Sequence, residues 1–279
     1  MHPTALFCFV LILSGFDLSA ANPKTDPNQI GRRRVEKGFN IYSRQREINL
    51  GRRWAQDIER EVRILNDTLV ADYVNRIGQN LARNSDAPSS LVIKVIQSDQ
   101  INALALPGGF LYVTTGLIRM ADNEAQLAGA LAHEIAHVNA RHGTRRETRN
   151  QLSIPLIMLG GIPGLAVRLV SLKLSRSAES EADMLGMQYL YRTGYDPGAF
   201  IVLLEKLGRL EQSPHRFSNL LSVHPAIDTR IKAARKVNRS LVPKPESKTQ
   251  TLEFEFVSSR LGGTTVHDTR NPDDLSGRD

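Results

Sequence analysis

The pentapeptide His133-Glu134-Ile135-Ala136-His137 constrains the fold more than any other part of this 279-residue chain. It lies in an expected helix from about Asn123 to His142, with Asp122 and Asn123 as possible N-caps and Gly143 where a C-terminal left-handed residue belongs. Residues four apart on an α-helix lie about 40° from each other around the axis, so both imidazoles project from one face. Neutral imidazole is a natural zinc ligand, and Glu134 flanks that face, where it can take a proton from a metal-bound water. The motif therefore predicts a metal-binding helix, although by itself it leaves open an exposed helix with two unrelated histidines.

A catalytic zinc ion needs a third protein ligand and an open position for water. His142 lies nine residues after the first histidine of the motif, about 180° around the same helix, so we expect it to pack behind the ligands rather than bind the ion. On a second expected helix, Glu179 and Asp183 share a face, whereas Glu181 is turned about 160° from it. One interpretation puts one carboxylate on the metal and uses the other to hold a ligand imidazole by its free N–H. The other treats the acidic residues as a helix N-terminus favoured by the helix dipole.

The hydrophobic pattern predicts a mainly helical fold with a small β-sheet, an α+β architecture. Apolar residues recur at helical spacing in the N-terminal half, and short runs rich in valine, isoleucine and aromatic residues predict strands. The expected elements are helices at 36–83, 123–142, 176–193 and from Asp196-Pro197 onward, strands at 91–96 and 110–114, and a short strand at Leu252–Val257 in an otherwise irregular tail.

The N-terminus predicts export. Ala5–Leu13 is an apolar run far shorter than the roughly 20 residues of a membrane-spanning helix, and the small residues that follow suit cleavage near Ala21. Removal of this signal peptide deletes Cys8, the one cysteine of the chain, and a cysteine-free protein suits an oxidising compartment. We therefore expect a periplasmic protein; a buried N-terminal strand is the alternative.

The formal net charge is +7, and arginines cluster at 32–34, at 52–53 and between 141 and 149. Such clusters suit an anionic membrane face, or they are simply solvated helix faces. No recognition motif for DNA or RNA accompanies them, so we expect no nucleic-acid partner.

The segment 150–168 is the second unusual feature of the chain. It carries no charge before Arg168, and Ile154–Val167 is almost wholly apolar but interrupted by prolines and glycines. Fourteen such residues are too few to cross a bilayer comfortably. The segment is either a buried hairpin, an apolar flap over the active site, or a peripheral contact with a membrane surface.

Five motifs in this order resemble one family of gluzincin zinc peptidases, the family that includes HtpX and the CAAX prenyl proteases, and within it the soluble, exported branch typified by BepA. The motifs are Asn102-Ala-Leu-Ala-Leu-Pro-Gly-Gly, Asn123-Glu-Ala-Gln-Leu-Ala, the HEIAH pentapeptide, Ser175-Arg-Ser-Ala-Glu-Ser-Glu-Ala-Asp, and His224-Pro225 with Arg230. The resemblance implies a gluzincin-type metallopeptidase domain in which the HExxH helix packs beside the ExxxD helix. We assign 1–21 to the signal peptide, 22–242 to the zinc metallopeptidase domain and 243–279 to a mostly irregular C-terminal extension.

The resemblance also implies a role for each site residue. In that family the glutamate four residues before the aspartate binds zinc, which selects Glu179 and leaves Asp183 to support a ligand. His224 is then either a displaceable fourth ligand in a closed state or a group that polarises the scissile carbonyl with Arg230. The implied ligands of one Zn²⁺ per chain are His133, His137 and Glu179.

The expected function is zinc-dependent hydrolysis of internal peptide bonds in unfolded or misassembled cell-envelope proteins, with Glu134 as general base. An edge near Asn102–Tyr112 would bind an extended substrate by main-chain hydrogen bonds. The residues expected to contact the substrate there are Asn102, Ala103, Gly108 and Gly109.

Two other interpretations remain open. One is a periplasmic chaperone or assembly factor with a latent zinc site, which His224 and the segment 150–168 would plug. The other is a mitochondrial relative of the same family.

Overall fold

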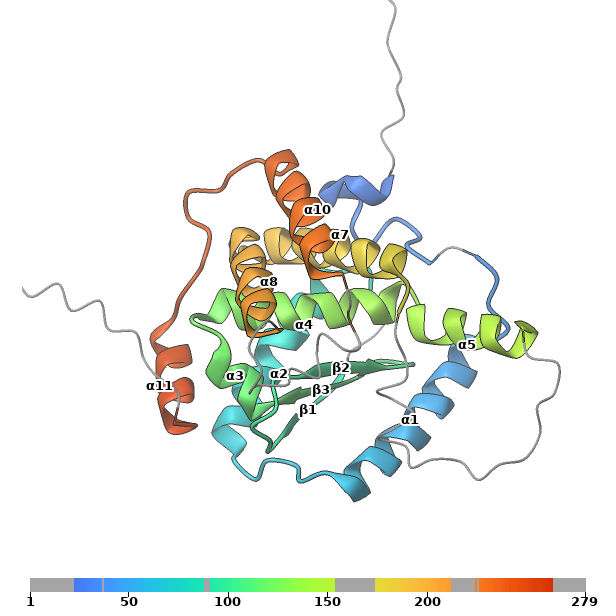
Figure 1. Ribbon diagram of the computed structural model, residues 1–279, viewed down its shortest axis with the longest axis horizontal. Helices are drawn as coiled ribbons and strands as arrows, with labels where there is room; N and C mark the ends of the chain where they lie inside the picture. Colours follow the sequence, from blue (N-terminus) through green and yellow to red (C-terminus); the bar gives the residue numbers. More distant parts are fainter. Residues whose placement is uncertain are drawn as a thin grey trace, which may run out of the picture.

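The computed structural model describes residues 23–36, 38–87, 91–153, 174–211, 224 and 226–262. The expected signal peptide, most of the apolar segment 150–168 and the end of the C-terminal extension lie outside these residues. The described part is mostly helical with one small sheet (Figure 1), which confirms the predicted fold class. Its helices are α1 (Arg44–Glu61), α2 (Thr68–Arg83), α3 (Thr115–Met120), α4 (Glu124–Asn139), α5 (His142–Ser153), α7 (Arg176–Thr193), α8 (Gly198–Glu211), α10 (Ile227–Ser240) and α11 (Leu252–Arg260), with two short 3-10 helices at Pro23–Thr25 and Pro27–Gln29.

Helix α4 is the central element of the fold. Asn123 caps it by accepting a hydrogen bond from the backbone N–H of Gln126 at 3.0 Å. Apart from Val138, all of its residues are buried, as expected of a helix that is apolar around most of its circumference. It lies between the sheet on one side and α7 on the other, with α2 and α8 packed beside it (Figure 1). The metal-binding motif is therefore held from several directions.

The predicted helix 123–142 is interrupted. α4 ends at Asn139 and α5 begins at His142, because Arg141 between them has a left-handed backbone with φ of 57°. A residue with a side chain rarely adopts this conformation, so nothing in the local sequence predicts the break.

The sheet has the strand order β1-β3-β2, with β1 at Val92–Ile96, β2 at Ala103–Leu106 and β3 at Phe110–Thr114. β1 is parallel to β3, and β2 is antiparallel to it. The strand β2 was not among the predicted strands, because its short run of alanine and leucine has little intrinsic strand preference. Gly108 and Gly109 have φ of 77° and 94°, which allows the tight turn between β2 and β3. The strand order places β2 at the edge of the sheet.

Two other predictions are corrected. The expected helical region 36–83 divides into α1 and α2, since the connecting segment carries a bridge from Ile64 to Ile96 and Asp67 caps α2. The expected strand at Leu252–Val257 is instead helix α11, which Thr251 caps by accepting from the N–H of Phe254 at 3.1 Å. Phe254 and Val257 are both buried, and their spacing of three fits a helix.

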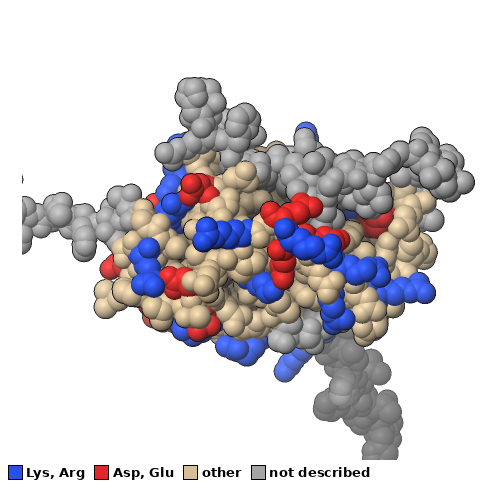
Figure 2. All heavy atoms as spheres, turned by 90° about the horizontal axis from the view of Figure 1, so that it is seen from below, with Lys and Arg blue, Asp and Glu red and all other residues tan. Residues whose placement is uncertain are grey.

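The surface carries charges of both signs. Figure 2 shows Lys and Arg side chains interleaved with Asp and Glu over the face seen from below. Several basic side chains form ion pairs with acidic neighbours, for example Lys94 with Glu59 at 2.7 Å and Arg235 with Glu205 at 2.7 Å. Among the described residues, none of the helices is long and apolar enough to cross a bilayer.

Candidate metal centre

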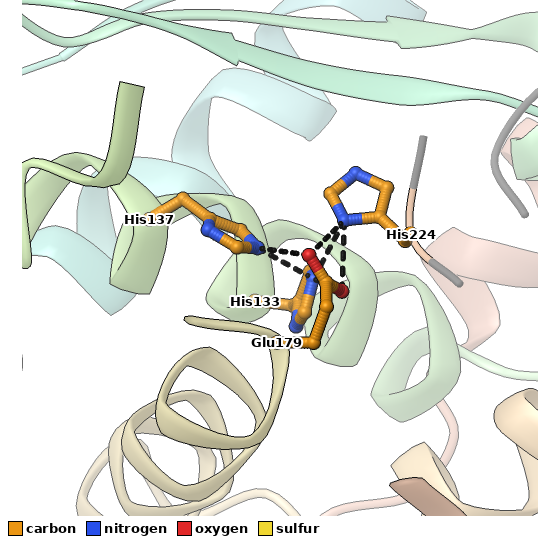
Figure 3. A group of neighbouring side chains, drawn as sticks. All are labelled: His133, His137, Glu179 and His224. Carbon is orange, nitrogen blue, oxygen red and sulfur yellow. Dashed lines mark hydrogen bonds and ion pairs between the residues drawn. The ribbon is translucent and has the colours of Figure 1, made fainter. Parts of the chain in front are cut away.

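Four buried side chains from three parts of the chain meet at one point (Figure 3). His133 and His137 come from α4, Glu179 from α7, and His224 from the segment that precedes α10. Each offers one nitrogen or oxygen, and these atoms all lie within 4.8 Å of one another. Two neighbouring turns of one helix and a carboxylate of another therefore converge, as the sequence predicts.

The distances between these atoms fit a tetrahedral zinc ion. Bonds of about 2.1 Å at tetrahedral angles place ligand atoms about 3.4 Å apart. His133 Nε2 lies 2.9 Å from His137 Nε2 and 3.5 Å from Glu179 Oε2. His224 Nδ1 lies 3.0 Å from both oxygens of Glu179 and 3.3 Å from His133 Nε2. Imidazole and carboxylate together form a donor set typical of catalytic zinc sites.

Small residues bring the two helices close enough for this convergence. Ser175 caps α7 by accepting from the N–H of Ala178, which places Glu179 in the first turn. Further along α7, a Cβ added at Gly186 would lie 3.1 Å from the backbone nitrogen of His133. Glycine at this position therefore permits a close helix crossing, and Glu179 reaches the histidines of α4 because of it.

Asp183 and Arg230 support the ligands from behind. Asp183 Oδ1 lies 2.9 Å from Nδ1 of His133, so it can accept the free imidazole N–H. The guanidinium of Arg230 donates to both oxygens of Asp183, at 2.7 and 2.9 Å. It also lies 3.2 Å from Glu179 Oε2, and it donates to the carbonyl of His224. Arg230 is buried among these groups and does not line the cleft, so its contacts are with Glu179, Asp183 and the backbone of His224.

His142 does not point away from the motif. The break after α4 returns its ring to the metal face, where its Nδ1 lies 2.8 Å from His137 Nδ1. Its Nε2 lies 3.0 Å from Oε2 of Glu181, a residue that helical spacing places away from the site. Sequence reasoning missed Glu181 because the contact depends on the left-handed turn at Arg141.

The electrostatics favour the metal-binding forms of Glu179 and His137, whereas His133 must lose a proton when it binds a metal ion. Burial alone would raise the pKa of Glu179, but the rings of His224 and His137 hold it well below its ordinary value. Burial and the neighbouring His133 lower the pKa of His137 well below the ordinary value. Burial and Arg230 oppose a charge on His133, but Asp183 and Glu179 outweigh them and raise its pKa to about 9. The carboxylate is therefore ionised and the His137 ring neutral at pH 7, as metal ligation requires.

A cleft of about 460 Å³ opens beside the cluster. Glu134, His137 and His224 line one part of it, and Nε2 of His224 lies 3.4 Å from Oε1 of Glu134. The strand β2 lines another part. The remaining wall carries apolar and aromatic side chains as well as charged ones, and the apolar and aromatic side chains include Trp54, Ile58, Ile96, Leu104, Leu106 and Tyr112.

Of the four residues expected to contact substrate, Asn102, Ala103 and Gly108 line the cleft. Asn102 Oδ1 is buried with no hydrogen-bond partner among the described residues. Gly109 does not line the cleft, because it belongs to the turn and its carbonyl accepts from the N–H of Val92 at 2.9 Å.

Comparisons with known proteins agree with the metal site described above. The family model described as Peptidase family M48 matches residues 68–238. The chain is 30% identical to the beta-barrel assembly-enhancing protease of Yersinia pestis and 29% identical to that of Escherichia coli (strain K12), in each case over 78% of this chain and 48% of the relative. It is 31% identical to the mitochondrial metalloendopeptidase OMA1 of Arabidopsis thaliana, over 52% of this chain and 31% of the relative. The chain thus spans about half the length of the first two relatives.

Proposed function

The chain belongs to peptidase family M48, and from this premise we propose that it is a zinc-dependent endopeptidase that hydrolyses internal peptide bonds. The observation that carries the proposal is the meeting of His133, His137 and Glu179 beside an open cleft, which Glu134 also lines. A bound zinc ion would polarise the scissile carbonyl and lower the pKa of water toward about 7.

The protein supplies the proton transfers. Glu134 follows the first ligand on α4 and lines the cleft, so its carboxylate can take a proton from attacking water and deliver it to the leaving amine. Asp183 keeps the proton of His133 on Nδ1, which leaves Nε2 free to face the other ligand atoms. Arg230 balances the charge of the two buried carboxylates.

The proposed substrate is an unfolded or misassembled protein of the cell envelope. Only β3 pairs with the edge strand β2 among the described residues, and β2 also lines the cleft, so an extended peptide can add to it by main-chain hydrogen bonds. Such binding tolerates many sequences but needs a locally unfolded chain. The expected signal peptide and the likeness to proteases named for beta-barrel assembly support a place in the periplasm.

The test is cleavage of casein by the zinc-loaded wild type and the variant Glu134→Gln. We expect the variant to bind zinc but to cleave about 10²–10⁴-fold more slowly, because the base is lost and the ligands remain. Equal cleavage by the two proteins would remove Glu134 from its proposed role.

One observation favours a second candidate, a chaperone or assembly factor with a latent zinc site. Nδ1 of His224 lies 3.0 Å from both oxygens of Glu179, so this ring takes up a ligand position that a catalytic ion leaves to water. Replacement His224→Ala distinguishes the candidates. Faster cleavage by this variant than by the wild type supports a self-inhibited peptidase. The absence of cleavage by both proteins, each loaded with zinc, supports the chaperone.

A further inference from the structure

We propose that His142 and Glu181 form a relay that positions the metal ligand His137, and that Lys24 anchors the relay to the N-terminal segment. The inference rests on the proposed metal site and adds two positioning residues that hold one of its ligands. The contacts run in sequence from His137 to His142, from there to Glu181, and on to Lys24.

With both rings neutral and Nε2 of His137 left free for a metal ion, the hydrogen bonds of the relay fit one arrangement of protons. Nε2 of His137 faces the other ligand atoms, at 2.9 Å from His133 Nε2, so a neutral His137 carries its proton on Nδ1. That proton points at Nδ1 of His142, 2.8 Å away, which must therefore accept it. His142 then carries its own proton on Nε2, which donates to the Glu181 carboxylate at 3.0 Å.

The far end of the relay is fixed by charge. The Lys24 ammonium donates to Oε1 of Glu181 and to the carbonyl of Val35, and Lys24 is buried. The guanidinium of Arg145 lies 3.8 Å from Oε2 of Glu181. Two cations from different segments thus hold the carboxylate that sets the tautomer of His142.

The backbone supplies an independent argument. A helix continued past Asn139 would turn His142 away from the metal face. The left-handed conformation of Arg141, at φ of 57°, instead starts a new helix with His142 at its first position. The left-handed region is disfavoured for a residue with a side chain, so the fold accepts local backbone strain at the point where it returns this ring to the ligand.

The two ligands of α4 are consequently held in different ways. His133 is fixed by the carboxylate of Asp183, which is itself bound to Arg230 inside the core. His137 is held by the neutral imidazole of His142. The carboxylate that holds His142 in turn belongs to Glu181, which is partly exposed. The second arrangement can be altered from outside the core without removing a ligand.

The experiment measures zinc affinity, by competition with a chromophoric chelator, and the visible spectrum of the cobalt-substituted protein. We expect His142→Leu to weaken zinc binding about 10–100-fold and to change the cobalt spectrum, because His137 loses its acceptor. His142→Asn should restore most of the affinity, since its side-chain oxygen can accept from His137. Likewise Glu181→Leu should weaken binding, and Glu181→Gln should retain more of it, because its amide oxygen still accepts from His142.

Ser180→Ala, on the same helix as Glu181 but outside the relay, is the control and should bind zinc as the wild type does. A folded His142→Leu protein with wild-type affinity and spectrum would overturn the inference. Equal losses in the leucine and polar variants at either position would also overturn it, because packing alone would then explain the effect. If His142→Leu does not fold, the zinc affinities of Glu181→Leu and Glu181→Gln test the inference instead. A wild-type protein that binds no zinc would instead refute the proposed metal site. Zinc affinity and the cobalt spectrum are both measured without any peptide cleavage.

Discussion

Around His133, buried charges of opposite sign are matched within a few ångströms. Asp183 and Glu179 carry two negative charges, and Arg230 contacts both, at 2.7 and 3.2 Å. All three side chains are at most 5% exposed, so solvent screens them little. Burial alone would lower the pKa of Arg230, but Asp183 and Glu179 raise it, so the guanidinium remains charged.

This arrangement predicts a large effect of Arg230→Met on stability. The variant leaves the two buried carboxylates with only the protonated His133 ring to balance them, and the free energy of unfolding of the zinc-free protein should fall by about 3 kcal/mol. Arg230→Lys keeps the charge but not the paired hydrogen bonds to Asp183, so its free energy of unfolding should lie between those of the wild type and of Arg230→Met. Urea denaturation at pH 7 measures both values. An Arg230→Met protein as stable as the wild type would mean that these charges are matched in another way.

At the scale of single residues, helical periodicity accounts for what the sequence could predict. The spacings of His133 with His137 and of Glu179 with Asp183 each lie within one helix, so each pair can be placed without knowledge of the fold. The partners of His142 could not be predicted in this way, because they depend on the backbone conformation of Arg141. His224 came only from resemblance, since its approach depends on tertiary packing.

Helix α1 is seated against the turn before β3 through a glycine. A Cβ added at Gly51 would lie 1.8 Å from the carbonyl oxygen of Pro107, so α1 would have to move away from the turn. Trp54 and Ile58 of the same helix line the cleft, which makes this contact relevant to the site.

We therefore expect Gly51→Ala to lower the free energy of unfolding by about 1–3 kcal/mol, although alanine favours a helix. Gly208→Ala is the matched control in α8, because its added Cβ would lie 3.4 Å from Cγ1 of Ile227, in ordinary contact. It should raise stability by roughly 0.5–1 kcal/mol. Thermal melts followed by circular dichroism compare the two, and similar shifts for both variants would contradict the close packing of α1.

At the scale of elements, the helix at 176–193 and the strands at 91–96 and 110–114 were predicted well, the long helical regions 36–83 and 123–142 proved to be divided, and β2 and α11 were not predicted. The prediction for 176–193 matches α7, and its end at Gly194 fits the left-handed φ of 89° found there. β2 and α11 were missed because each is short and takes its conformation from a partner: β2 from pairing with β3, and α11 from its cap and two buried apolar residues. The local sequence of β2 and α11 has too weak a preference for strand or helix to predict either element.

Over the whole molecule, Glu124 joins four separate segments. Its carboxylate accepts from Tyr73 of α2 at 2.8 Å and from Tyr195, after α7, at 2.7 Å. It also accepts from Thr251, which caps α11, and lies 3.2 Å from Nζ of Lys248. Burial alone would raise the pKa of Glu124, but the hydroxyls of Thr251, Tyr195 and Tyr73 hold it below its ordinary value of 4.5.

The lowered pKa predicts a pH-dependent effect of Glu124→Gln. The ionised carboxylate stabilises the fold above the ordinary pKa, and this contribution is lost as the pH falls through the lower pKa of the folded state. The variant should be less stable than the wild type by about 1–3 kcal/mol at pH 7, and the difference should shrink below about pH 4. Urea denaturation across this range tests it, with Glu253→Gln, at an exposed ion pair with Arg76, as control. A difference that does not change with pH would count against the ionised cluster.

Removal of the metal should loosen the whole domain. His133 and His224 are 91 residues apart in the chain, so an ion that binds both connects distant segments. Zinc at 100 times its dissociation constant should stabilise the fold by about 2.7 kcal/mol, and a chelator should lower the melting temperature accordingly. Glu179→Ala should show a much smaller response to the chelator. Identical melts of the wild type with zinc and with chelator would contradict the proposed site.

The origin of the ligands in successive parts of the chain also orders events during biosynthesis. Translation proceeds from the amino end, so a half-made polypeptide displays only the two imidazoles of α4, too few to retain a catalytic ion. The carboxylate of α7 arrives later, and His224 later still. The proposed metal site is accordingly complete only after the segments that carry all of its ligands have been synthesised.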